Sequence, residues 1–164
     1  MVWYGFEQLG TEFAQRRVSH TGGTVNTRED RPASTAADAP VLCIVDDDGS
    51  TVELVREVAE ESGWVAYGFE RIEEARRFLS ARQPTLLVLD DDLPDGRGGD
   101  LARELSEDPT RDVPVLVCTA AHPTRQREIG EWAPVLSKPF DIIDFERHLE
   151  ARTDHIAKHP DTTG

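Results

Sequence analysis

Acidic residues follow directly on two runs of apolar residues. They fill positions 46–48, after VLCIV (41–45), and positions 90–92, after TLLVL (85–89). Adjacent carboxylates repel one another, and crowding raises the pKa of at least one member of a pair. A divalent cation that prefers oxygen ligands, such as Mg²⁺, would remove that repulsion. If the fold brings the two clusters together, we therefore expect them to form a cation site.

Two further apolar runs end in residues that suit the binding of a phosphoryl group. Thr119 follows VPVLVC (113–118), and Lys138 follows PVLS (134–137). A lysine supplies a fixed positive charge, and a threonine hydroxyl supplies a hydrogen-bond donor. Together with carboxylates and Mg²⁺, these groups suit phosphoryl transfer, in which catalysis consists mostly of positioning and charge neutralisation. A carboxylate can itself be the nucleophile and form an aspartyl phosphate.

The elements that must position these groups are predicted by the alternation of apolar runs with amphipathic segments. Continuous apolar strands are typical of a parallel sheet that helices bury on both faces. We therefore predict an α/β fold with a five-stranded parallel sheet, doubly wound as (βα)5. In such a sheet the ligand site lies beyond the carboxyl ends of the strands. The predicted strands are 41–45, 64–69, 85–89, 113–118 and 134–137.

Capping and breaking residues predict where the helices begin and end. Ser50 with Glu53 forms a capping-box pattern at the start of the first helix, and Gly63 ends it. Asp141 is the predicted N-cap of the last helix. A weak helix, with few apolar anchors, is predicted over residues 124–132.

Composition divides the chain of 164 residues into four parts. Residues 1–20 contain several aromatic residues and form an arm of unknown role. Residues 21–40 are rich in Gly, Thr, Ala, Asp and Pro, which is typical of a flexible linker. The folded domain is predicted over residues 41–151, and a short polar tail over residues 152–164.

Net charge and apolar runs exclude several classes of partner. A formal net charge of −14 repels phosphate backbones and anionic lipid, so we expect no direct binding to nucleic acid or membrane. There is no apolar run of about 20 residues and no secretory signal pattern. Cys43 and Cys118 both lie inside apolar runs, where reduced core thiols are expected. These features favour a cytoplasmic protein.

The ordered set of motifs resembles the receiver domain of two-component response regulators, the CheY-like family. The motifs are VDDDGS, LVLDDDLPDGRGG, VLVCTAA and LSKPF, and the resemblance covers Val41 to Ala151. Each motif alone is common by chance, but all of them occur in the family's order on five alternating strands. The resemblance implies the flavodoxin-like receiver fold and a bound Mg²⁺.

The resemblance also implies a role for individual residues. Asp90 would be the phosphoacceptor, because Pro94 and Gly98 follow it at the family's spacing. Thr119 would be the switch residue that hydrogen-bonds the phosphoryl group. Lys138 would pair with a phosphoryl oxygen and be followed by a cis bond to Pro139. The implied metal ligands are Asp46, Asp47, Asp90 and the backbone carbonyl of Asp92.

Two acids of these motifs receive no such role. Asp91 is an ordinary residue at its position in the family's pattern. Asp48 is expected to be a solvated acid in a loop.

By this resemblance the protein would be a stand-alone response regulator in a two-component phosphorelay. A sensor histidine kinase or a histidine phosphotransfer protein would donate the phosphoryl group to Asp90. The transfer and the later dephosphorylation would be self-catalysed and Mg²⁺-dependent, so no separate enzymatic activity is expected. The signal would pass by contact with a downstream protein target, and phosphorylation could also bring two copies together as a homodimer.

Two alternatives stay open. A pseudo-receiver adaptor would bind a partner without phosphorylation. A haloacid-dehalogenase-like phosphatase also places an Asp-x-Asp nucleophile motif after a strand, as at Asp90 and Asp92. However, Leu93 and Pro94 do not fit that motif, and that family's nucleophile precedes its acidic pair, the reverse of the order in this chain.

The chain departs from the receiver pattern between residues 119 and 138, where the segment is short. Val135 also stands where many receivers have a Tyr or Phe that turns inward on phosphorylation. Trp132 is a candidate to replace that aromatic residue by repacking.

Overall fold

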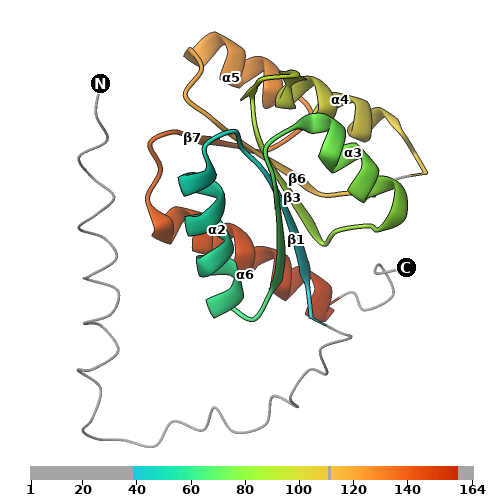
Figure 1. Cartoon of the computed structure of the whole chain (residues 1–164), viewed down its shortest axis with the longest axis vertical. Helices are drawn as coiled ribbons and strands as arrows, with labels where there is room; N and C mark the ends of the chain where they lie inside the picture. Colours follow the sequence, from blue (N-terminus) through green and yellow to red (C-terminus); the bar gives the residue numbers. More distant parts are fainter. Residues whose placement is uncertain (1–38, 111, 159–164) are drawn as a thin grey trace, which may run out of the picture. The chain divides into compact units, whose positions relative to one another are not determined.

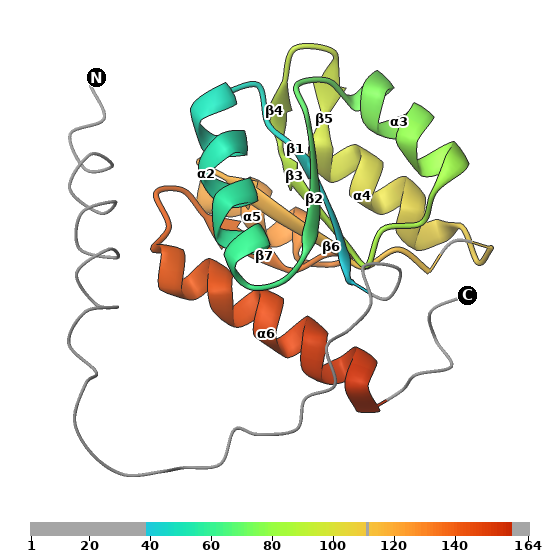
Figure 2. The same cartoon turned by 60° about the horizontal axis from the view of Figure 1, so that its bottom comes forward.

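A computed structural model describes residues 39–110 and 112–158, so the predicted arm (1–20) and nearly all of the predicted linker (21–40) lie outside the described residues. The described part is a five-stranded parallel sheet with helices on both faces (Figures 1 and 2). The strand order is β2-β1-β3-β6-β7, which confirms the predicted doubly wound α/β fold. The strands are β1 (Val41–Val45), β2 (Val65–Phe69), β3 (Leu86–Asp90), β6 (Val115–Thr119) and β7 (Val135–Ser137).

Helices α2 and α6 cover one face of this sheet, and α3, α4 and α5 cover the other (Figures 1 and 2). Within the described residues, no helix combines the length and the apolar composition that crossing a membrane requires. The helices are α2 (Gly49–Glu61), α3 (Ile72–Ala81), α4 (Gly98–Glu107), α5 (Pro123–Ile129) and α6 (Ile142–Lys158).

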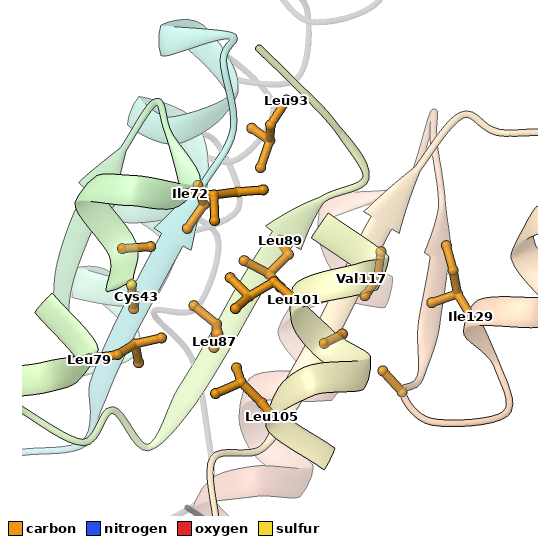
Figure 3. Packing of buried hydrophobic residues seen from close by; sticks show 14 residues of the cluster. Cys43, Ile72, Leu79, Leu87, Leu89, Leu93, Leu101, Leu105, Val117 and Ile129 are labelled. Carbon is orange, nitrogen blue, oxygen red and sulfur yellow. The ribbon is translucent and has the colours of Figure 1, made fainter. Parts of the chain in front are cut away.

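The strands are continuously apolar because both of their faces are buried. Along β1, Cys43 and Val45 pack toward α3 and α4, whereas Leu42 and Ile44 pack toward α2 and α6. Figure 3 shows the cluster on the α3 and α4 side, where Leu87 and its neighbours fill the space between sheet and helices. Burying one such side chain contributes about 1.5–3 kcal/mol, so the two clusters fix the sheet in place.

Helix α2 begins earlier than the predicted capping box. Its N-cap is Asp48, whose Oδ1 accepts a hydrogen bond from the Ser50 amide at 2.9 Å. Both residues are good capping types, and the one closer to the strand takes the role. Gly63 ends the helix as predicted, with a φ of 86° that favours glycine. Asp48 is therefore a helix cap and not simply a solvated acid.

Helix α6 runs on to Lys158, through half of the segment predicted as a polar tail from residue 152. Its sequence contains no Gly or Pro, so nothing breaks the helix at that point. Arg152 also anchors the second half, because its Nε donates to the carbonyl oxygen of Thr85 at 3.0 Å. As predicted, Asp141 caps the start, where its Oδ1 accepts from the Ile143 amide at 2.9 Å.

A two-stranded antiparallel ribbon, β4 (Asp92–Leu93) and β5 (Gly96–Arg97), follows β3 and was not predicted. Asp95, in the turn between them, caps helix α3. Its two carboxylate oxygens accept from the Ile72 and Glu73 amides, each at 3.0 Å. The residue that precedes α3, Arg71, makes no capping bond with its side chain. The loop after β3 thus fixes the start of a helix that precedes it in sequence.

Candidate functional site

Three carboxylates meet at the carboxyl ends of β1 and β3. Strands β1 and β3 are parallel neighbours with Val45 opposite Leu89, so the acids that follow lie at one edge of the sheet. Asp46 and Asp90 are buried and Asp47 is exposed, and each offers an oxygen within 4.8 Å of those of the other two. The fold thus brings two acids of the first cluster together with Asp90 of the second, which is the condition for the predicted cation site.

Lys138 reaches this group from the end of β7. Its Nζ lies 2.6 Å from Asp46 Oδ2 and 3.2 Å from Asp90 Oδ2, so one ammonium bridges the two buried acids. The backbone holds it there, because its amide donates to the Thr119 carbonyl oxygen at 2.8 Å. The bond to Pro139 is cis, as predicted.

The electrostatics of the pocket favour a cation. Burial raises the pKa of the Asp46 carboxyl above its ordinary value, against the opposing effect of Lys138. Burial works to lower the pKa of Lys138, but the two carboxylates beside it raise it overall, so the lysine stays charged. One ammonium among three carboxylates leaves negative charge uncompensated. This all-oxygen donor set fits a hard divalent cation such as Mg²⁺.

Thr119 closes β6 beside β3, whose residue Asp90 lies opposite Cys118 in the parallel register. The Thr119 side chain is buried. Its hydroxyl oxygen accepts a hydrogen bond from the Ala121 amide at 3.0 Å, which ties it to the loop that leads into α5. The structure therefore places Thr119 on the strand next to the pocket, and its role as a switch stays a prediction.

Gly98, at the start of α4, lies against the backbone of Asp90. A Cβ at this position would lie 2.0 Å from the Asp90 carbonyl oxygen, far inside van der Waals contact. The Gly98 amide donates to the Asp91 carbonyl oxygen at 3.1 Å. Only glycine lets α4 approach the end of β3 this closely.

Asp91 has a structural role that the motifs did not predict. It is fully buried, and its carboxylate accepts two hydrogen bonds from Arg125, both at 3.1 Å, and one from the Gly99 amide at 2.9 Å. Burial alone would raise the pKa of this carboxyl, but Arg125 and the Gly99 amide hold the pKa below its ordinary value. The sequence did contain a signal for this role. Successive side chains of a strand point to opposite faces, so a side chain next to Asp90 is expected to face away from the side on which Asp90 lies.

The Asp92 side chain pairs with Arg97 at 2.9 Å, and 82% of it is exposed. The proposed metal ligand at this position is the backbone carbonyl, which stays a prediction.

Comparison with known proteins places this fold and pocket in a family. The model of the response regulator receiver domain matches residues 42–150, about two thirds of the chain. The chain belongs to this family. Receiver domains are the phosphorylated modules of two-component systems, and they generally bind Mg²⁺ through acidic residues, which agrees with the clustered carboxylates of this receiver.

Sequence relatives of this receiver include larger regulators. The phosphate regulon transcriptional regulatory protein PhoB of Pseudomonas aeruginosa is 34% identical over 115 residues, which cover 67% of the chain and 50% of PhoB. The chain spans about half the length of the curated relatives it matches.

Solved receiver structures share the fold. The receiver domain of a signal transduction histidine kinase from Syntrophus aciditrophicus is 25% identical, with a TM-score of 0.66 over 72% of this chain and 92% of that one. The beryllofluoride-activated receiver domain dimer of NtrC4 is 22% identical, with a TM-score of 0.64 over 70% of this chain and 98% of that one.

Proposed function

We propose that the protein accepts a phosphoryl group onto Asp90 in a two-component phosphorelay. The observation that carries this proposal is the bridge from Lys138 Nζ to Asp46 and Asp90, at 2.6 and 3.2 Å, inside a pocket with surplus negative charge. This bridge holds the Asp90 carboxylate at the carboxyl ends of the strands. It also keeps the Lys138 ammonium on the side where phosphoryl oxygens would lie.

The chemistry is an in-line displacement at phosphorus. A carboxylate oxygen of Asp90 attacks the phosphorus of a phosphohistidine, the new P–O bond forms as the P–N bond breaks, and the imidazole leaves with the bonding pair. Lys138 stays protonated, since its pKa is raised by the two acids, and it compensates charge on the transferring oxygens. Water later attacks the phosphorus of the acyl phosphate, the P–O bond to Asp90 breaks, and inorganic phosphate leaves while the Asp90 carboxylate is restored.

Mg²⁺ fits the donor set of Asp46, Asp47 and Asp90. When bound there it would supply charge neutralisation for the transferring phosphoryl group. Before transfer, Lys138 and the Asp48 amide, which donates to Asp46 Oδ1 at 3.0 Å, hold the Asp46 carboxylate in one orientation.

Partners and location follow from the receiver family. We infer a sensor histidine kinase or a histidine phosphotransfer protein as phosphodonor, in the cytoplasm, and a downstream protein as the target of the signal. A homodimer is a further product to look for, since an activated receiver relative is described as a dimer.

Acetyl phosphate with Mg²⁺ tests the proposal directly. Intact mass should show one added phosphoryl group on the native protein and none on Asp90→Asn. The matched control is Asp144→Asn, which removes an exposed acid of α6 and should be phosphorylated like the native chain. Steady hydrolysis of phosphomonoesters would favour the phosphatase alternative. A protein that binds its partner but gains no mass would instead be an adaptor.

A further inference from the structure

A buried charge pair beside Asp90 takes no part in the phosphoryl chemistry described above. Asp91 is fully buried, and the side chain of its partner Arg125 is 28% exposed. The guanidinium binds the carboxylate with two hydrogen bonds, from Nε to Oδ2 and from Nη2 to Oδ1, both at 3.1 Å. This two-point geometry is specific to arginine and stronger than a single charged contact.

The Asp91 carboxylate joins three elements. It follows the last residue of β3, accepts from the Gly99 amide on α4, and is bound by Arg125 on α5. Arg125 Nη2 also lies 3.0 Å from Asp100 Oδ1 on α4. The pair therefore connects the end of β3 to α4 and α5, two of the three helices on that side of the sheet.

The packing around the pair leaves little space for movement. A Cβ on Gly99 would lie 2.8 Å from Ile129 Cγ1, 2.9 Å from Asp91 Oδ1 and 3.0 Å from Arg125 Nη2. Ile129 is itself fully buried, and Trp132 Nε1 donates to the Gly99 carbonyl oxygen at 3.2 Å. Helix α5 is thus held against α4 at the site of the charge pair.

A second contact of α5, made by Gln126, leads to Thr119 and the loop that follows it. Gln126 Nε2 donates to the Ala121 carbonyl oxygen at 2.9 Å and to Ser137 Oγ at 3.1 Å. Ala121 is also the residue whose amide binds the Thr119 hydroxyl. A movement of Thr119 toward a phosphoryl group on Asp90 would displace the loop 120–122 and, through Gln126, helix α5. The contact between Arg125 and Asp91 opposes that displacement.

We propose that the Asp91–Arg125 pair restrains α5 against β3, the strand that ends in Asp90. The restraint thereby opposes the binding of a phosphoryl group, or of its mimic, at Asp90. Arg125 is a positioning residue in this scheme, because it acts through α5 and does not touch the reacting atoms. The inference rests on the proposed function of Asp90 and deepens it by naming a restraint on the conformational change. Val135 occupies the position where many receivers have an aromatic residue that turns inward, and in this scheme the change passes through α5 instead.

The coupling is reciprocal by thermodynamic necessity. If the pair stabilises the unmodified arrangement, a ligand that mimics the phosphoryl group weakens the pair. A substitution that removes the pair must then raise the affinity for that ligand by the factor by which the pair had lowered it. Beryllofluoride with Mg²⁺ is the probe, since it occupies the acceptor site without a covalent step.

The test variant is Asp91→Asn with Arg125→Gln. The double substitution removes both charges together, so no buried charge is left without a partner. We expect beryllofluoride to bind at least about 5-fold tighter than to the native protein. Amide hydrogen exchange over residues 123–129 should also be faster in the variant without ligand. Far-UV circular dichroism and the thermal midpoint check that the variant is folded.

A matched control separates this effect from the general loss of an ion pair. Arg76→Gln removes a two-point arginine–carboxylate contact to Glu104, at 2.6 Å, that joins α3 and α4 on the exposed surface. Its beryllofluoride affinity should equal that of the native protein. If the double variant fails to fold, Arg125→Lys replaces it. This variant keeps the charge but loses the fork, and it should show a smaller increase in affinity in the same direction.

The outcomes distinguish this proposal from the proposed function. A folded variant with native affinity for beryllofluoride overturns the restraint on occupancy, even if α5 exchanges faster. A native protein that neither binds beryllofluoride nor takes a phosphoryl group contradicts the proposed function. Exchange in α5 then still decides whether the pair restrains the helix, and unchanged exchange overturns that part as well.

Discussion

Asp90 and Asp91 are neighbours in sequence with opposite environments. Asp90 and Asp46 share a single lysine, and with Asp47 they form a group whose negative charge is not compensated. Asp91 has a two-point contact with an arginine and a hydrogen bond from a backbone amide. Asp91 is fully buried, whereas 9% of Asp90 is exposed. The two acids therefore differ both in exposure and in the number of donors around each carboxylate.

The largest effect on stability should come from removing the arginine that binds Asp91. Arg125→Ala leaves the Asp91 carboxylate buried without its main partner, which should lower the free energy of unfolding by about 3 kcal/mol. Urea denaturation measures the change. Arg76→Ala, which removes an exposed two-point contact to Glu104, should cost less than about 1 kcal/mol. Equal losses in the two variants would show that Asp91 is not specially dependent on Arg125.

An intermediate effect should appear on the pocket side when Mg²⁺ is added. A cation that binds only the folded state stabilises it by about 2.7 kcal/mol at a concentration of 100 times its Kd. We expect this gain in the native protein and its loss in Asp47→Asn, which removes the exposed acid of the pocket. Unfolding followed by tryptophan fluorescence at several Mg²⁺ concentrations gives both values. The variant with Asp91→Asn and Arg125→Gln should keep most of the gain, because its substitutions lie on the other side of the strand.

The smallest effect should come from the third acid of the same loop. Asp92 pairs with Arg97 at 2.9 Å, but both side chains are mostly exposed. Exposed pairs contribute little, so Arg97→Gln should change the free energy of unfolding by less than about 0.5 kcal/mol. The measurement uses the same urea series as for Arg125→Ala. A loss above about 1 kcal/mol would mean that the β4–β5 ribbon depends on this pair.

The sheet and the pocket could be predicted from sequence because both depend on local patterns. The strand at Val41–Val45 has its predicted bounds, since it is apolar throughout and ends in acids. The rule that ligand sites lie at the carboxyl ends of the strands predicts that Asp46, Asp90 and Lys138 meet if their strands are neighbours, and the strand order meets that condition.

The partners of the other acids could not be predicted in the same way. Arg125 lies 34 residues from Asp91 in sequence, and the two meet only because α5 packs beside α4. Asp95 caps α3, a helix that begins 23 residues earlier. The choice of Asp48 over Ser50 as a cap depends on where the backbone leaves β1. A count of acids therefore predicts a charged loop, whereas the packing of helices decides what each acid does.

The unbroken helix α6 offers a reference position for spectroscopy. It starts four residues after Lys138, and Arg152 binds the backbone of Thr85, just before the amino end of β3. Cys43 and Cys118 are buried, and burial raises the pKa of each thiol to about 12, so neither should take up a thiol-directed dye at neutral pH. A cysteine introduced at the exposed Ala157 would then carry a label selectively. Displacements of α5 could be measured as changes in its distance from that labelled position.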